Sequence, residues 1–284
     1  MACKGAKRNN PVGFGNPVYI TSQSAAQSLP ENKPQAAEVS AEPVVLQGES
    51  LIFGVDSKVS ATTMLQNNLT VYEWARRNKV EPSFWGRNIN GDGALTAAEI
   101  RFLHEQGCTV AATYTEAGEK LTEEQGRVAA KKVDIIALEL GLRDGAAIFL
   151  ELGATEFAST DFMKGFADSL LASGFIPGFK ANTDAEFGFD REFSRGIVND
   201  GDIFKKCVVW ATAPNMKEYD RVNTTHLIHP DVWQPFAPSG IKRSDIRVWQ
   251  YGLNCHPIDD EKGAEVTFNV DLIGRIETLP ECMI

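Results

Sequence analysis

Eight short apolar segments of strand length recur along the chain, and patterns of helical periodicity separate most of them. Strands that alternate with helices predict βαβ units and a parallel sheet. Eight such units over about 225 residues match a (β/α)8 barrel, which typically has about 250 residues. We therefore expect an α/β fold, a TIM-type barrel.

The competing fold is a doubly wound open sheet, but no GxGxxG follows the first strand. The expected strands cover residues 51–56, 83–89, 109–114, 146–152, 175–181, 207–211, 247–251 and 265–273.

Capping residues and apolar spacing show where helices should lie. Thr96 and Glu99 have the spacing of a capping box, and the helix that they open should end near Gly107. Residues 215–244 contain prolines and no regular period, so we expect no complete helix between the sixth and seventh strands. The other expected helices cover 61–78, 122–140, 162–172 and 186–198.

The first 48 residues differ from the rest. The first 50 residues hold 5 of the 13 prolines, and their four basic and four acidic residues cancel. Residues 22–43 are mostly Ser, Ala, Gln, Glu and Pro, which bury too little apolar surface to offset the entropy of ordering. We expect residues 1–48 to form a flexible tail or linker, followed by the barrel over 49–284.

The charge balance limits the partners. The formal net charge is −10, whereas binding to nucleic acid or to an anionic membrane needs clustered Lys and Arg. No segment approaches the roughly 18 consecutive apolar residues of a membrane span. We therefore expect neither nucleic acid nor membrane as a partner. Residues 1–8 are basic, but Asn9, Asn10 and Pro11 follow in place of an apolar region, so no standard secretory signal is expected and the localisation stays open.

Metal and cofactor motifs are weak in this sequence. The five cysteines are widely spread without a CxxC, which predicts reduced structural thiols, and the four histidines lack metal-ligand spacing. Residues 88–99 fit the spacing of an EF-hand loop, but Asn88 replaces the usual Asp and Glu99 already belongs to the capping box. A polar turn is the preferred interpretation over calcium binding. We expect no metal and no cofactor.

Polar and aromatic residues near the ends of the expected strands suggest a carbohydrate site. In a TIM barrel the site lies at the carboxyl ends of the strands. Glycoside cleavage needs two carboxyl groups, aromatic rings stack on sugars, and amides and arginine bind hydroxyls. The candidate catalytic residues are Asp56, Glu116, Glu151 and Asp271, and the candidate substrate-binding residues are Arg87, Lys180, Asn182, Trp210, Trp249, Gln250 and Tyr251.

Each of these candidates has a purely structural alternative. A carboxylate can be capping, solvated or ion-paired, and Glu151 could pair with Arg87 or with Lys180. The tryptophans and Tyr251 could pack in the core instead of stacking on a ligand.

Several ordered segments resemble a known family. The chain is similar over about residues 51–274 to the glycoside-hydrolase-like TIM-barrel domain of unknown function that is found in many Gram-positive bacterial proteins and is related to family 25 lysozymes. The resemblance implies cleavage of cell-wall polysaccharide, with Asp56 and Asp271 matching the aspartates of the first and eighth strands. The segments that carry it are Phe53-Gly54-Val55-Asp56, Phe84-Trp85-Gly86-Arg87, residues 94–100, Gly107, Tyr114, Trp249-Gln250-Tyr251 and Asn269-Val270-Asp271-Leu272.

The chain departs from this family at two positions. Asn88 follows Arg87 where the family has Tyr, and Gly153 stands where the family places an Asp at the end of the fourth strand. Glu151 is two residues earlier, on the same face of the strand, and could replace the lost carboxylate. Equally, the site could have lost its acid.

Two functions follow from this pattern. The first is a glycoside hydrolase of peptidoglycan or a related bacterial glycan, with Glu151 as general acid and with Asp56 or Asp271 as base, nucleophile or electrostatic stabiliser. The second is a non-catalytic, glycan-binding or structural barrel, which the glycine at position 153 favours. An association with a phage belongs to this second alternative. The fold alone does not decide between them.

Overall fold

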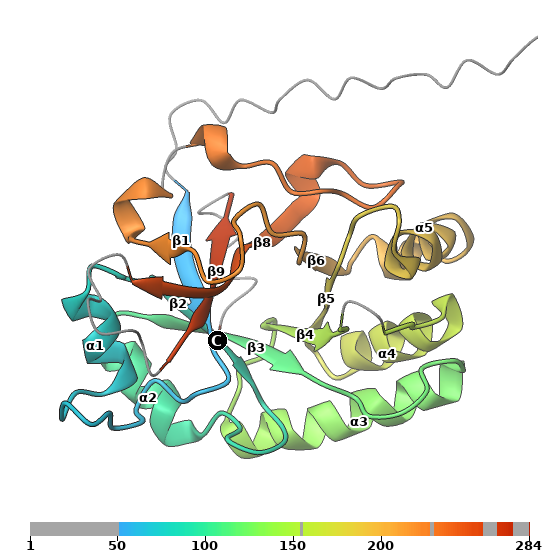
Figure 1. The fold of residues 1–284 in the computed structure, drawn as a ribbon. Coiled ribbons are helices and arrows are strands. Elements are labelled where there is room, and N and C mark those ends of the chain that lie inside the picture. Colours follow the sequence, from blue (N-terminus) through green and yellow to red (C-terminus); the bar gives the residue numbers. More distant parts are fainter. Residues whose placement is uncertain (1–50, 154–155, 228–229, 258–265, 275–283) are drawn as a thin grey trace, which may run out of the picture. The chain divides into compact units, whose positions relative to one another are not determined.

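Eight strands close into a barrel in the computed structural model, which describes residues 51–153, 156–227, 230–257, 266–274 and 284 (Figure 1). Strands β1 to β6 pair in sequence order, β1 also pairs with β9, β9 with β8, and β8 with β6, which closes the ring. The expected TIM-type barrel is therefore confirmed. The strands are β1 (Ile52–Asp56), β2 (Phe84–Asn88), β3 (Thr109–Tyr114), β4 (Ala147–Glu151), β5 (Ile176–Ala181), β6 (Val208–Ala211), β8 (Ile246–Pro257) and β9 (Phe268–Ile273), and the short β7 (Arg221–Val222) pairs with β8.

The orientation of the last strand differs from the expectation. β9 runs antiparallel to both of its neighbours, β1 and β8, whereas the other barrel strands are parallel. Its amino-terminal end therefore lies beside the carboxyl end of β1, and Asn269 pairs with Asp56 in the register. Polar residues early in β9 thus reach the same rim as residues late in β1.

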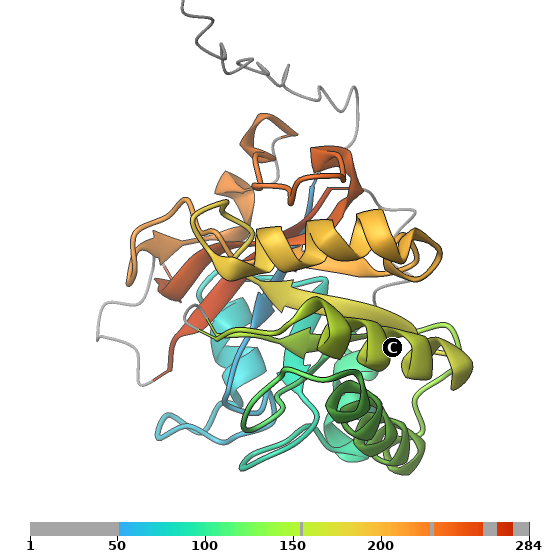
Figure 2. The ribbon, with the colours of Figure 1, turned by 90° about the vertical axis from the view of Figure 1, so that its right-hand side faces the viewer.

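Helices cover the outside of the ring, and Figure 2 shows α3, α4 and α5 stacked along one side. Threonine and serine side chains cap four of the helices: Thr70 caps α1, Thr96 caps α2, Thr122 caps α3 and Ser159 caps α4. As predicted, the described residues between β6 and β8 form only 3-10 turns and β7. The helices are α1 (Val71–Arg77), α2 (Ala97–Glu105), α3 (Glu123–Leu140), α4 (Thr160–Ala172), α5 (Gly188–Asn199) and the short α6 (Gly201–Phe204), and the 3-10 turns are Thr224–His226, Pro230–Val232 and Arg243–Asp245.

The first helix is shorter than predicted. The spacing over 61–78 suggested one long helix, but α1 begins only at Val71. Thr70 caps it and forms a complete capping box with Glu73, and a turn with Asn68 in the left-handed region precedes the cap. A strong cap can set the start of a helix even where apolar periodicity continues on its amino-terminal side.

Two apolar layers hold the barrel together. Side chains alternate along each strand, so one set points into the ring and the other toward the helices. The inner set is small and comes only from strands, whereas the outer set forms the main core with the helices. The inner cluster consists of Phe84, Ala111, Ala147, Phe149, Val208, Trp210, Val248 and Ile273, with Ile52 and Ile176 packed against it.

Some expectations fall outside the described residues. The predicted tail over 1–48, Cys3 and Cys282 are among these. Within the part of the chain that the structure describes, no helix is both long and apolar enough to cross a membrane.

Candidate active site

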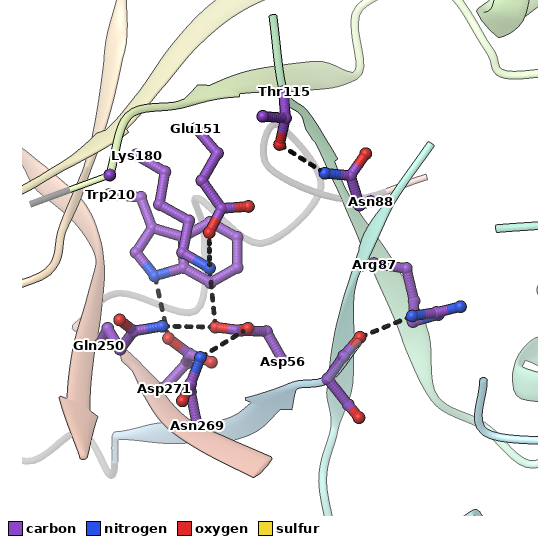
Figure 3. Close-up of polar contacts among 12 residues, drawn as sticks. Asp56, Arg87, Asn88, Thr115, Glu151, Lys180, Trp210, Gln250, Asn269 and Asp271 are labelled. Atoms are coloured by element: carbon purple, nitrogen blue, oxygen red, sulfur yellow. Dashed lines mark hydrogen bonds and ion pairs between the residues drawn. The ribbon is translucent and has the colours of Figure 1, made fainter. Parts of the chain in front are cut away.

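Asp56 ends β1 above the inner apolar cluster, and three side chains donate hydrogen bonds to its carboxylate (Figure 3). The donors to Oδ2 are Lys180 Nζ at 2.9 Å and Gln250 Nε2 at 2.6 Å. Asn269 Nδ2 donates to Oδ1 at 2.9 Å. The side chain is 13% exposed, so the carboxylate is fixed yet reaches solvent. Charge-assisted bonds of this kind hold a carboxylate in one orientation.

Lys180 links Asp56 to a second carboxylate. Its Nζ lies 3.3 Å from Glu151 Oε1, so that oxygen and Asp56 Oδ2 are at most 6.2 Å apart, the sum of their distances to the shared nitrogen. The ammonium also lies 4.6 Å from the centre of the Trp210 ring. Burial disfavours the charged lysine, but Asp56, Glu151 and Asp271 outweigh burial and raise the pKa of Lys180. Of the two pairings considered for Glu151, the structure has the one with Lys180.

Asp271 lies below this pair and is completely buried. Trp210 Nε1 donates to its Oδ1 at 2.9 Å, whereas Oδ2 has no hydrogen-bond partner among the described residues. Burial, reinforced by the neighbouring Asp56 carboxylate, raises the pKa of Asp271 well above its usual value, against the opposing effects of Lys180 and Trp210. Asp271 therefore keeps its proton to a higher pH than an exposed aspartate does.

A glycine makes room for this arrangement. A Cβ at Gly86 would lie 2.5 Å from the Cβ of Asp56 and 2.9 Å from Cη2 of Trp210. Such contacts do not occur between real side chains, so only glycine lets β2 pass this closely behind Asp56 and Trp210.

The Asp56 pocket is a hollow of about 250 Å³ above these groups. Apart from Gly86 and Gly153, the residues that line it carry polar side chains, which can bind the hydroxyl groups of a ligand. A second hollow of about 280 Å³ adjoins it and shares Asp56, Ser57, Lys58 and Asn269. The Asp56 pocket is lined by Asp56, Ser57, Lys58, Gly86, Asn88, Thr113, Thr115, Glu151, Gly153, Glu156 and Asn269.

Arg87 lies apart from the pocket, although it sits on β2 between two residues that line it (Figure 3). Its guanidinium binds the carbonyl oxygens of Ser57 and Gly93 and forms an ion pair with Glu99 at 3.0 Å. Both side chains of that pair are 1% exposed. Arg87 therefore fastens the loops after β1 and β2 rather than lining the Asp56 pocket.

Glu116 also lies elsewhere. Its carboxylate accepts a hydrogen bond from Tyr114 and pairs with Lys132 at 2.7 Å. It borders a different hollow, formed with the first turns of α3. The structure does not bring Glu116 together with the other candidate carboxylates.

The candidate aromatic residues do not form a platform in the Asp56 pocket. Trp210 is buried inside the barrel and binds Asp271. Trp249 packs on the outer side, where its Nε1 donates to the carbonyl of Ala213 and its ring contacts Tyr251 edge to face. Asn182 follows β5 and closes a turn by accepting from the backbone N–H of Asp184.

The EF-hand-like segment is held as a polar turn. Asn88 and Asn90 bind Thr115 of the neighbouring loop with side-chain and backbone hydrogen bonds. Glu99 does not close a capping box, because its carboxylate binds Arg87 and the backbone N–H of Ala61. No group of three or more His, Cys, Asp or Glu suited to a metal ion occurs among the described residues.

Sequence reasoning missed several residues that line the pocket. Thr113 and Asn88 point inward by strand alternation and could have been found from their position. Lys58 and Glu156 come from loops, whose conformation no periodicity predicts.

Comparison with known proteins supports the fold. No family model and no curated protein matches the chain. An uncharacterised protein of B. stearothermophilus shares the fold with a TM-score of 0.66 and 22% identity over 82% of this chain and 100% of its own. Looser similarities include a bacterial lysozyme from Streptomyces coelicolor, with a TM-score of 0.45 and 12% identity over 79% of this chain and 92% of its own. The modular autolysin LytC from Streptococcus pneumoniae, solved with a synthetic peptidoglycan ligand, has a TM-score of 0.44 and 15% identity over 78% of this chain and 46% of its own.

Proposed function

We propose that this protein is a glycoside hydrolase that acts on peptidoglycan or a related bacterial cell-wall glycan. The observation that carries the proposal is the position of Asp56, a fixed and charged carboxylate at the floor of a polar pocket, with a second carboxylate at most 6.2 Å away. Glycoside hydrolysis proceeds through a positively charged, oxocarbenium-like transition state. An anionic Asp56 stabilises that charge, either through space or by forming a covalent bond.

The remaining polar groups have distinct roles in this proposal. Lys180, Gln250 and Asn269 hold Asp56 in position, and Asn269 also lines the pocket. Hydroxyl and amide groups of Asn88, Thr113 and Thr115 line the wall, where they can bind sugar hydroxyls. Burial and the Asp56 carboxylate raise the pKa of Asp271, so it keeps its proton to a higher pH than an exposed aspartate does, which limits the negative charge in the buried site.

Release of reducing ends from purified bacterial cell walls tests this function. We expect release by the wild type, and a loss of about 100-fold or more in the Asp56→Asn variant, because removal of a transition-state charge partner costs this much in other enzymes. The Glu151→Gln variant should also lose activity, since its carboxylate shares Lys180 with Asp56. A wild-type protein that releases no reducing ends overturns the hydrolase proposal.

A non-catalytic glycan-binding barrel is the second candidate. It is favoured by the pairing of both Asp56 and Glu151 with one buried lysine and by the glycine at position 153. Retention of the protein on sedimented cell walls, without any release of reducing ends, is the result that this candidate predicts.

A further inference from the structure

A third carboxylate enters the Asp56 pocket from the loop that follows β4. Glu156 lies over Gly153, and the backbone N–H of Gly153 donates to Glu156 Oε2 at 3.2 Å. A Cβ built on Gly153 would lie 3.4 Å from Glu156 Cγ and 3.9 Å from Oε1. The carboxylate of Glu156 therefore occupies the space that a side chain at position 153 would fill.

The surroundings of Glu156 suit a side chain that contacts a ligand. Its side chain is 40% exposed, close to the 37% of Glu151 and above the 13% of Asp56. Lys120, which is 3% exposed, supports the carboxylate at 3.4 Å and is itself anchored on the carbonyl of Gly118. This support comes from outside the pocket lining, so it fixes Glu156 without filling the hollow.

Glu151 is placed differently. Its carboxylate is bound at the floor of the pocket to the Lys180 ammonium, which also holds Asp56. Glu156 approaches from the loop. Glycoside cleavage needs one carboxyl group beside the anomeric carbon and another beside the glycosidic oxygen. The loop position supplies that second location.

We propose that Glu156 is the residue that transfers the proton in the hydrolysis reaction, which makes this inference dependent on the proposed function. In its acid form Glu156 gives its proton to the glycosidic oxygen as the bond from that oxygen to the anomeric carbon breaks. As a carboxylate it then takes a proton from the water molecule whose oxygen bonds to the anomeric carbon. One water is consumed for each bond cleaved, and Glu156 regains its starting form.

The Glu156→Gln variant tests this role on soluble cell-wall fragments. General acid–base groups contribute about 100-fold or more, so kcat should fall by at least that factor. The activity of the wild type should fall at both low and high pH, because one limb of the pH profile reports the group that acts as a base and the other the group that acts as an acid. The Glu156→Gln variant should lose one of these two limbs. The matched control is Glu139→Gln on the exposed face of α3, which should keep wild-type activity. A Glu156→Gln variant within about threefold of the wild type, or with both limbs retained, overturns the inference.

A second variant moves the carboxylate back to the strand end. The three atoms nearest to a Cβ built on Gly153 all belong to the side chain of Glu156, so shortening Glu156 to alanine frees space for a longer residue there. Glu156→Ala should lose activity as Glu156→Gln does, and adding Gly153→Glu to it should restore activity at least about tenfold. A double variant that folds normally and remains as inactive as Glu156→Ala contradicts proton transfer at this position. An inactive wild type would instead overturn the proposed function itself, so the two failures are distinguishable.

Discussion

At the scale of single residues, Asp271 makes stability depend on pH. Its folded pKa is raised above the unfolded value of about 3.8, so its contribution to stability is complete below that value and is lost as pH rises through the folded pKa. The Asp271→Asn variant has nothing to ionise. Its melting temperature relative to the wild type should therefore increase as pH rises from about 4 toward neutral. A difference that stays constant or decreases over this range would contradict the assignment.

Gly86 is the second residue for which we predict the effect of a substitution on stability and activity. The Gly86→Ala variant places a methyl group against Asp56 and Trp210 and should cost about 1–3 kcal/mol in unfolding free energy, as overpacking does. It should also reduce glycan hydrolysis, because Asp56 must move. Gly153→Ala is the matched control for stability, since its nearest contact would be an ordinary 3.4 Å. Urea unfolding of both variants measures the contrast, and equal losses would refute this account of Gly86.

At the scale of elements, the buried pair of Arg87 on β2 and Glu99 on α2 fixes the loops that follow β1 and β2. The Arg87→Met variant leaves Glu99 buried without its partner and should destabilise the protein by about 3–5 kcal/mol. Replacing both residues by Met should cost much less, because no uncompensated charge remains. Calorimetric unfolding checks both variants, and a double variant as unstable as the single one would contradict this role.

The sequence predicted the elements better than their directions. All eight barrel strands were placed, because each is a compact apolar segment between polar turns. The reversed β9 was missed, because the strands predicted over 247–251 and 265–273 leave residues 252–264 between them, which is enough for the dozen or more residues of a parallel connection. In the structure β8 continues to Pro257, so only residues 258–267 separate it from β9, and this short spacing goes with an antiparallel strand.

Strand alternation explains which candidate residues the barrel brings together. Asp56, Glu151, Lys180, Gln250 and Asp271 share the inward phase with the apolar residues below them, and this set could be predicted from sequence. Arg87 and Trp249 have the opposite phase and point outward. The sequence alone could not place Glu156, because its position depends on a loop contact with Gly153 and Lys120.

At the scale of the whole molecule, we propose that the barrel hydrolyses a glycan and that the negative charge of Asp56 stabilises the transition state of the reaction. The most direct measurement is mass spectrometry of soluble products from purified cell walls, before and after borohydride reduction. We predict fragments that carry one added water and one reducible end for each bond cleaved, and their absence with Asp56→Asn. Intact walls after prolonged incubation with the wild type, or equal release by Asp56→Asn, would contradict the claim.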